Sequence, residues 1–240
     1  QQKQPSLFSL YTVMPTSRPQ RALARAFSSV ALGEAAVQIE WSVQYVFYTP
    51  ALLRLGVSPE LAGLAWLLSP LLMLAVSPCL GERSDRCAHR WGRRRPFLAI
   101  TTACIAISLL AIPLADGVGG ALGDVAGRRH AAIAVLVAAN VLLDLGNCLH
   151  EQLLRAMATD LCPLRHQARM HSLIGASVGL GNALGNAASS ADYSGLVAGL
   201  PSESFVFLAA WLVFCVASAG MFCLADERPL TQRSAVGDRE

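Results

Sequence analysis

Long runs of apolar residues are separated along the chain by short polar stretches. Within the runs, apolar and polar residues do not alternate with a period of two. A membrane-spanning α-helix needs roughly 20 predominantly apolar residues to cross about 30 Å of hydrocarbon. Barrel strands would instead alternate over about ten residues, so the pattern predicts an all-α integral membrane fold with six transmembrane helices. The predicted helices are residues 26–48, 61–80, 97–115, 131–149, 170–191 and 205–224.

Composition supports a membrane protein. Of the 240 residues, 54% are hydrophobic and 15% are charged, whereas soluble domains carry about 25% charged residues. The seven cysteines form no Cys-x-x-Cys pair and no phosphate-binding glycine loop is present, so we expect no metal and no cofactor. The segment "HEQLL" from His150 has Leu154 where a metalloprotease needs its second histidine, so no enzyme is predicted. The first residue is Gln1, and we expect a fragment or a processed product.

The placement of arginine predicts the orientation. Six arginines lie between the second and third predicted helices, and such basic loops stay in the cytoplasm. An even number of crossings then puts both termini there, while Arg128 and Arg129 on the predicted outer side depart from the rule. We divide the chain into a basic cytoplasmic tail (1–25), a transmembrane domain (26–224) and a cytoplasmic tail or the start of a central loop (225–240). A tight loop offers no free face with stacking aromatics, so no nucleic-acid partner is expected.

The fourth predicted helix carries ionisable side chains on one face. Asp144, Asn147, Glu151 and Arg155 are spaced so that an α-helix brings them together. A carboxylate at membrane depth usually faces a protein interior or a water-filled path. We interpret this face as a proton and substrate site, with Asp144 as the proton carrier and Arg155 as a hydrogen-bond donor. The alternative is that Asp144 and Arg155 only tie neighbouring helices together.

The first predicted helix has two polar edges. Glu34, Gln38 and Tyr45 form one edge, Glu40 and Gln44 form the other, and Trp41 lies between them. Amides and carboxylates can pair with sugar hydroxyls while an aromatic ring stacks on the apolar face of the sugar, so we interpret this helix as part of a site for a polyhydroxylated ligand. Packing between polar helices remains the alternative. Trp66 and Trp211 are interpreted as ordinary helix or interface aromatics.

The basic loop predicts a cytoplasmic gate. Asp85 precedes the run Arg93, Arg94 and Arg95, and in a short loop a carboxylate can pair with arginine beside a helix N-terminus. A latch that breaks and re-forms suits a protein with two states.

The fifth predicted helix carries glycines at a spacing that permits close helix approach. The pairs are Gly175 with Gly179 and Gly181 with Gly185. We expect helix packing at both pairs, with Asn182 and Asn186 forming interhelical hydrogen bonds or lining a cavity.

Four stretches also carry a family resemblance. They are "VQIEWSVQYVFYTPALLRLGVSP", "WLLSPLLMLAVSPCLGERSDRCAHRWGRRRPF", "DLGNCLHEQLLRAMATDL" and "GLGNALGN". In this order they resemble the first helix, the second helix with its signature loop, the fourth helix and the fifth helix of the glycoside–pentoside–hexuronide branch of the major facilitator superfamily. The plant sucrose–proton symporters and the animal solute carrier family 45 are the more closely similar members. The resemblance implies a twelve-helix carrier of which this chain is the N-terminal half, so a C-terminal six-helix half is expected in cis or in trans.

The resemblance also implies roles for individual residues. Asp144 and Arg155 match positions implicated in proton coupling and sugar transport. Gln38, Trp41 and Gln44 match polar or aromatic positions of the family's first helix. The gating loop is matched by Ser84, Asp85, Arg86, Gly92, Arg93, Arg94 and Arg95.

The resulting hypothesis is proton-coupled symport of a sugar, with sucrose as the expected substrate, by alternating access. The membrane is expected to be the plasma membrane or that of an acidic organelle. Two alternatives stay open. One is a non-transporting regulatory or scaffold half-carrier. The other is a carrier of another polar solute such as a polyamine, because Glu34 and Glu40 would suit a cation, and Glu40 departs from the small residue that plant members favour.

Overall fold

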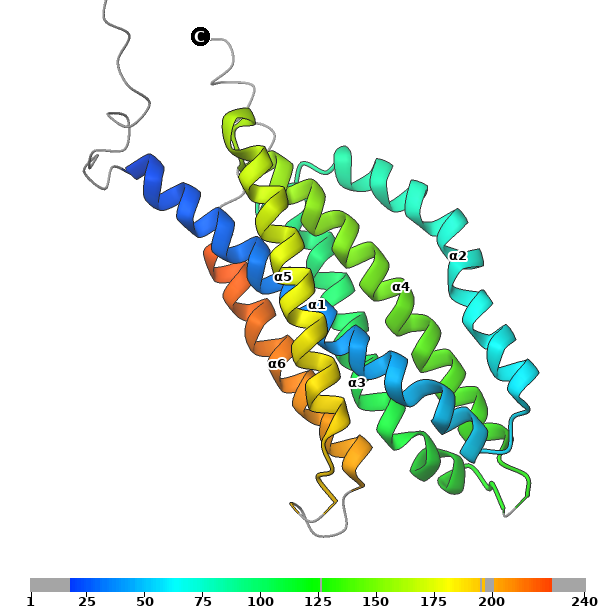
Figure 1. Cartoon of the computed structure of the whole chain (residues 1–240). Coiled ribbons are helices and arrows are strands. Elements are labelled where there is room, and N and C mark those ends of the chain that lie inside the picture. The colour runs from blue at the N-terminus through cyan, green and yellow to red at the C-terminus, as the bar shows by residue number, and fades with distance from the viewer. Residues whose placement is uncertain (1–17, 126, 195, 197–200, 226–240) are drawn as a thin grey trace, which may run out of the picture.

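The computed structural model describes residues 18–125, 127–194, 196 and 201–225, and these residues form six α-helices (Figure 1). The helices are α1 (Arg18–Arg54), α2 (Pro59–Asp85), α3 (Arg95–Ala121), α4 (His130–Leu161), α5 (Leu164–Ser190) and α6 (Ser202–Leu224). Their number and order confirm the predicted all-α fold, and most of them continue beyond the apolar runs. The expectations for residues 1–17 and 226–240 lie outside the described residues.

The helices differ in how apolar they are. By length and composition, α2, α3, α4 and α6 are apolar enough to cross a membrane. The middle of α1 is more polar, and its buried polar side chains face α4 and α5. This polarity therefore lies inside the bundle, where neighbouring helices supply hydrogen-bond partners that lipid cannot.

Side chains satisfy the first backbone N–H groups of two helices. The Ser58 side chain accepts a hydrogen bond from the first turn of α2, and Pro59 follows at the first helical position. At the start of α4, the two carboxylate oxygens of Asp124 accept hydrogen bonds from the N–H groups of Ala131 (3.0 Å) and Ala132 (2.8 Å). These contacts satisfy one free N–H group at the start of α2 and two at the start of α4.

Glycine brings α5 close to α1. A Cβ atom added at Gly185 would lie 2.5 Å from the main-chain oxygen of Ile39 in α1, and Gly181 approaches α1 nearly as closely. A different result holds for Gly175 and Gly179, where an added Cβ would meet nothing within 4 Å among the described residues. The described residues therefore provide no close contact at this second pair, and packing there stays a prediction. Six helical residues separate the two pairs and rotate the side-chain direction by about 240°, so both pairs cannot face α1.

Helix α2 stands apart from the rest of the bundle. It curves along its length, packs mainly against α4 and leaves most of its leucines exposed (Figure 1). Pro70 and Pro78 lie inside it, and each removes a backbone hydrogen bond, which accounts for the curvature. The other helices share two apolar clusters, one around Tyr48 and one around Leu154 and Met157.

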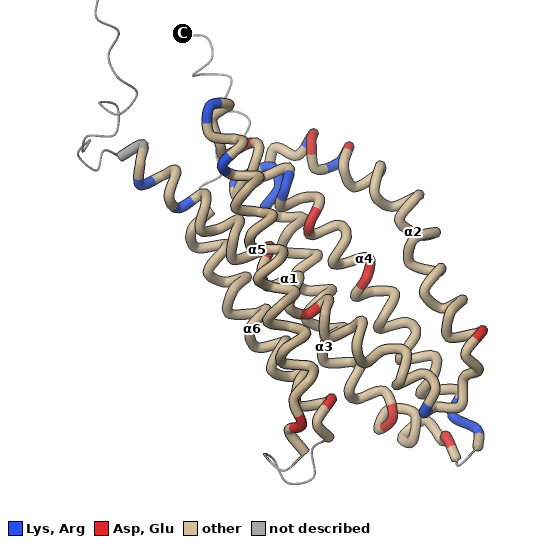
Figure 2. The backbone as a smooth tube through the Cα atoms, viewed as in Figure 1, with Lys and Arg blue, Asp and Glu red and all other residues tan. Residues whose placement is uncertain are grey.

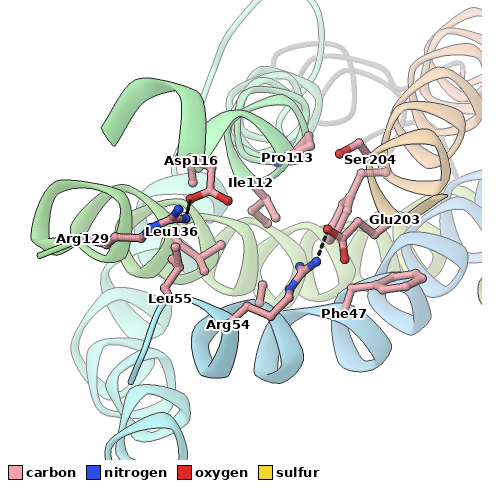
Figure 3. Close-up of a pocket in the computed structure, with 13 residues that line it drawn as sticks. Phe47, Arg54, Leu55, Ile112, Pro113, Asp116, Arg129, Leu136, Glu203 and Ser204 are labelled. Carbon is pink, nitrogen blue, oxygen red and sulfur yellow. Dashed lines mark hydrogen bonds and ion pairs between the residues drawn. The ribbon is translucent and has the colours of Figure 1, made fainter. Parts of the chain in front are cut away.

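Basic side chains gather at one end of the bundle, where α1 begins, α2 ends and α5 begins (Figure 2). At the opposite end Arg54 pairs with Glu203 at 2.5 Å, and Arg129 pairs with Asp116 at 2.6 Å. Both ion pairs line one pocket of about 200 Å³ between α1, α3, α4 and α6 (Figure 3). The charge of Arg129 is thus balanced locally, which accounts for part of its departure from the orientation rule.

Candidate functional site

Helices α1 and α4 run antiparallel and meet through polar side chains in the middle of the bundle (Figure 1). Nε2 of Gln44 donates to Oδ1 of Asp144 at 2.6 Å and to Oδ1 of Asn140 at 2.9 Å. Asn140 also donates from Nδ2 to Oδ2 of Asp144 at 3.4 Å. Asp144 therefore meets two amide donors, which stabilise a carboxyl group at membrane depth.

The next contact along the interface joins Glu40 and Asn147, both of which are fully buried. The side chain of Asn147 faces the Glu40 carboxyl group. No hydrogen bond of normal geometry reaches either carboxyl oxygen of Glu40 or either amide atom of Asn147 from the described residues. The neighbouring pairs along the interface, in contrast, are joined by hydrogen bonds or ion pairs.

Toward the start of α1 the contacts become ionic. Nε2 of Gln38 donates to Oε1 of Glu151 at 3.3 Å, and Oε1 of Gln38 accepts from Nδ2 of Asn182 in α5 at 3.1 Å. Arg155 pairs with Glu151 one turn away, and its Nε lies 3.4 Å from Oε1 of the buried Glu34. One arginine thus serves two carboxylates from two helices.

These contacts form an ordered series, which we call the α1–α4 polar seam. It consists of Glu34, Gln38, Glu40 and Gln44 of α1 with Asn140, Asp144, Asn147, Glu151 and Arg155 of α4. Each step toward the start of α1 matches a step toward the end of α4, as antiparallel helices require. The two predicted polar edges of α1 therefore face the same neighbour. Asn182, Ser42 and Asn186 extend the hydrogen bonding to α5.

A pocket of about 460 Å³ opens beside the polar seam. Its lining comes from α1, α2 and α4 and comprises Trp41, Tyr45, Trp66, Ser69, Pro70, Met73, Asp144, Cys148, Glu151, Gln152 and Arg155. The rings of Trp41 and Tyr45 stack with centroids 6.0 Å apart, and Tyr45 stacks on Trp66 at 5.3 Å. A volume of this size with aromatic walls and few charged groups is typical of small-molecule sites.

The residues predicted for the site fall into two groups, those that line the pocket and those that do not. Trp41, Asp144 and Arg155 line it, while Glu34, Gln38, Glu40, Gln44 and Asn147 belong to the seam and are absent from its lining. Arg155 contacts Glu34 and Asp144 contacts Gln44, so both predicted functional residues of α4 also connect this helix to α1, as the alternative interpretation expects.

Trp66 corrects a prediction made from the sequence. It was interpreted as an ordinary aromatic, yet it lines the pocket and donates from Nε1 to Oγ1 of Thr49 at 3.1 Å. Ser69 and Met73 follow it at positions that share one face of a helix, and both line the same pocket. That spacing can be seen in the sequence, but the residues around it in α2 are almost all apolar and gave no indication that this face lines a pocket.

The position of Asp144 within its helix is also revised. The predicted fourth helix ended at residue 149, which placed Asp144 close to its inner end. In the structure α4 continues to Leu161, and Asp144 lies near its middle. The extra turns are polar, so a hydropathy pattern does not include them.

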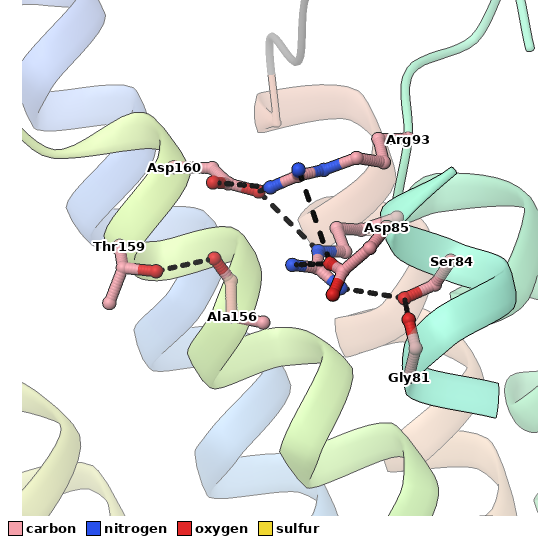
Figure 4. Close-up of polar contacts among 8 residues, drawn as sticks. Gly81, Ser84, Asp85, Arg93, Ala156, Thr159 and Asp160 are labelled. Carbon is pink, nitrogen blue, oxygen red and sulfur yellow. Dashed lines mark hydrogen bonds and ion pairs between the residues drawn. The ribbon is translucent and has the colours of Figure 1, made fainter. Parts of the chain in front are cut away.

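A second cluster lies at the basic end of the bundle, and we call it the arginine latch (Figure 4). Nη2 of Arg94 lies 2.6 Å from Oδ1 of Asp85, and Nη1 of Arg94 donates to the Ser84 hydroxyl at 2.6 Å. Nη2 of Arg93 lies 2.5 Å from Oδ2 of Asp160 in α4, and Nε of Arg94 lies 3.4 Å from the same oxygen. The latch therefore joins α2, the loop and α4. Asp160 is a member that sequence reasoning missed.

The remaining loop residues serve different neighbours. Arg95 donates from Nη2 to the main-chain oxygen of Phe222 at 2.6 Å, which joins the start of α3 to the end of α6. Arg86 pairs with Glu82 at 2.8 Å on the exposed surface of α2. Gly92 has a φ of 114°, a backbone conformation that favours glycine and turns the chain toward α3.

The described part of the chain offers no group of three or more His, Cys, Asp or Glu side chains that could hold a metal ion. His150 is fully buried, and its Nδ1 lies 2.9 Å from the Thr101 hydroxyl. The side chains that line the pocket can supply hydrogen bonds, aromatic stacking and carboxyl groups that bind protons.

Comparison with known proteins gives consistent results. Residues 30–239 match the family described as the Major Facilitator Superfamily. The chain is 30% identical over 201 residues to solute carrier family 45 member 4 of Homo sapiens, covering 81% of this chain and 26% of that protein. It is 35% identical over 148 residues to sucrose transport protein SUC4 of Arabidopsis thaliana, covering 61% and 28%. It is 30% identical over 145 residues to proton-associated sugar transporter A of Homo sapiens, covering 60% and 19%. The chain thus spans about a quarter of the length of the first two of these relatives.

Proposed function

Because the chain belongs to the Major Facilitator Superfamily, we propose that it forms part of a proton-coupled sugar carrier that works by alternating access. The family shows an integral, multi-pass membrane protein, and it supports a carrier rather than an enzyme. Relatives named as sucrose transport proteins and as a proton-associated sugar transporter support a sugar, with sucrose as the first choice. The observation that carries the proposal is an aromatic pocket with a carboxyl group in its wall.

The pocket supplies matching contacts for a sugar. Trp41, Tyr45 and Trp66 offer a stacked aromatic surface to the apolar face of a sugar ring. Glu151 and Arg155 place an acceptor and donors on the same wall for hydroxyl groups. The ligand would lie between the rings and α4.

Asp144 is the proposed proton carrier of this pocket. It lies in the wall near the middle of α4, where the charge of a carboxylate is costly and a proton removes that cost. Binding a proton therefore changes the relative stability of the two states of the carrier. The two amide groups that contact Asp144 can reorient to serve either form of the acid.

The arginine latch is the proposed gate at the cytoplasmic side. It joins the ends of α2 and α4 through Asp85 and Asp160, so rocking of these helices would break charge-assisted hydrogen bonds that re-form in the return step. Three helices of this chain line the pocket. A second six-helix unit, in the same polypeptide or another, is proposed to close its open side.

The test uses the complete carrier that contains this chain, reconstituted in proteoliposomes with an imposed proton gradient. We expect Asp144→Asn to abolish proton-driven accumulation of labelled sucrose. Glu60→Gln is the matched control, because Glu60 is an exposed acid in the first turn of α2. Undiminished pH-dependent accumulation in Asp144→Asn would refute the proposal.

A cationic solute is the second candidate, and the charges in the pocket favour it. Asp144 and Glu151 line the pocket with a single arginine, Arg155. Glu40, which the sequence offered as support for a cation, is buried away from the pocket and contributes no contact there. Uptake of labelled sucrose and of labelled spermidine, each competed by the other solute, separates the two candidates, since a cation-selective pocket would take up spermidine and would be insensitive to unlabelled sucrose.

A further inference from the structure

Gln152 lines the pocket but stands outside the polar seam. The charged side chains that α4 gives to the pocket all contact α1, and they are Asp144, Glu151 and Arg155. The hydrogen bond of Gln152 runs to α2 instead, because the Ser77 hydroxyl donates to Oε1 of Gln152 at 2.6 Å. Gln152 thus joins the α4 wall of the pocket to the α2 wall.

This contact continues the face of α2 that lines the pocket. Trp66, Met73 and Ser77 are separated by seven and four residues, so an α-helix places them on one face. Trp66 bonds to Thr49 of α1 near the start of α2, and Ser77 bonds to Gln152 of α4 further along. Because α2 stands apart from the rest of the bundle, these two bonds help to hold it over the pocket.

The bond to Ser77 determines which end of the Gln152 amide a ligand can meet. A glutamine amide has a carbonyl oxygen that accepts hydrogen bonds and an NH2 group that donates them. Since Oε1 of Gln152 accepts from Ser77, the NH2 group is left for the pocket, and the described residues supply no acceptor for it. Gln152 therefore offers N–H donors that carry no charge.

These donors matter because the pocket contains two acids. Asp144 and Glu151 can accept hydrogen bonds from an ammonium group or from a hydroxyl group, so they suit both candidate solutes. Arg155 donates as well, but it already serves Glu34 and Glu151. An ammonium group has no acceptor and gains nothing beside the NH2 group of Gln152, whereas a sugar hydroxyl oxygen can accept from it. Gln152 therefore favours a sugar over a cation.

We propose that Gln152 is a specificity-determining residue of the carrier, whose NH2 group donates to a hydroxyl oxygen of the sugar and disfavours an ammonium group. This inference rests on the proposed function. Ser77 is a positioning residue, because it acts on the sugar only through the orientation of the Gln152 amide. The two side chains thereby turn an acidic pocket toward a neutral polyhydroxylated solute.

Gln152→Glu tests the donor with little change of shape. Glutamate keeps an oxygen that can accept from Ser77, but it places a second acceptor where the NH2 group was. In the complete carrier in proteoliposomes, we expect the KM for labelled sucrose to rise about 10-fold or more with little change in the maximal rate, and inhibition by spermidine to strengthen. Gln167→Glu adds the same charge on α5 outside the pocket lining and should change neither. A wild-type KM in Gln152→Glu would overturn the proposal.

Sugar analogues keep the proposal testable if Gln152→Glu does not fold. Among monodeoxy sucroses, the one that lacks the contacted oxygen should bind the wild-type carrier about 3- to 10-fold more weakly than sucrose. It should bind Gln152→Leu as well as sucrose does, because the donor is then missing. If Gln152 only held α2 in place, Gln152→Leu would weaken sucrose and every analogue equally, and that result would overturn the proposal.

The role of Ser77 has its own measurement. Ser77→Ala lets the amide of Gln152 rotate, so the KM for sucrose should rise less than in Gln152→Glu while the maximal rate stays unchanged. Ser77→Thr keeps the hydroxyl and should restore the wild-type KM. A Ser77→Ala carrier with the wild-type KM would overturn the positioning role.

Failure of the proposed function is a separate result. A wild-type carrier that takes up spermidine in preference to sucrose would overturn the sugar itself. A sucrose carrier whose selectivity does not respond to Gln152→Glu would overturn only the role of Gln152.

Discussion

Replacement of Gly185 by alanine tests the closest helix contact in the structure. The added Cβ would lie 2.5 Å from the main-chain oxygen of Ile39 and 2.7 Å from Cβ of Ser42. Neither is the flexible end of a long side chain, so α1 and α5 must move apart. That movement would also stretch the hydrogen bond from the Ser42 hydroxyl to Oδ1 of Asn182, which is 2.9 Å long.

The cost follows from three contributions. Overpacking of a tight contact costs about 1–3 kcal/mol. Weakening the two hydrogen bonds that Asn182 makes with Ser42 and Gln38 costs roughly 0.6 kcal/mol each between membrane helices. Alanine regains about 1 kcal/mol of helix propensity over glycine. The net loss for Gly185→Ala is therefore about 1–3 kcal/mol, which lowers the melting temperature by roughly 2–12 °C.

The measurement is a thermal melt of the purified protein in detergent, followed by size-exclusion chromatography of the fraction that remains folded. Gly179→Ala is the matched control on the same helix, because its added Cβ meets nothing within 4 Å among the described residues. This control should melt at or above the wild-type temperature, with a gain of up to about 1 kcal/mol from helix propensity. Equal melting temperatures for the two variants would refute the close packing of α5 on α1.

Three further predictions concern the charged groups. Arg155→Gln removes the ionic partner of the buried Glu34. Because Arg155 is 47% exposed, we expect the free energy of unfolding to fall by about 1–3 kcal/mol. Adding Glu34→Gln in a double-mutant cycle should restore most of that loss. In the arginine latch, Asp160 is 14% exposed and Asp85 is 56% exposed. Asp160→Asn should therefore lower the melting temperature more than Asp85→Asn, which should cost less than about 1 kcal/mol. The reverse order would contradict the latch geometry. Asp124→Ala removes the acceptor of two N–H groups at the start of α4 and should cost about 1–2 kcal/mol in the same melt, with faster amide exchange at Ala131 and Ala132.

Part of the site could be read from the spacing of residues on single helices. Asp144, Asn147, Glu151 and Arg155 share a face of α4, and the sequence predicted that this face looks into the protein. Their shared orientation depends only on the helical period, which local sequence determines. Their partners belong to α1, and no pattern within either helix indicates that Glu40 faces Asn147 or that Gln44 faces Asp144.

The arginine latch shows the same division. Asp85 and the arginines are near in sequence, and their pairing was predicted from that nearness. Asp160 lies 66 residues after Arg94 and joins the latch because α4 continues beyond its apolar run and ends beside the loop. A distant residue of this kind enters a site only when the packing of helices brings it there.

The sequence by itself determined the membrane class, the six helices and the basic end of the bundle, because these depend on hydropathy, helical period and charge along short stretches. The family followed from the resemblance of four stretches to known carriers. Only the tertiary structure decided that Gly181 and Gly185 face α1 while Gly175 and Gly179 do not, that Trp66 lines the pocket, and that the Glu40 carboxyl group is buried opposite Asn147. The physical reason is that a helix fixes the relative directions of its own side chains, whereas the angle and depth at which it meets its neighbours come from close packing summed over the whole bundle.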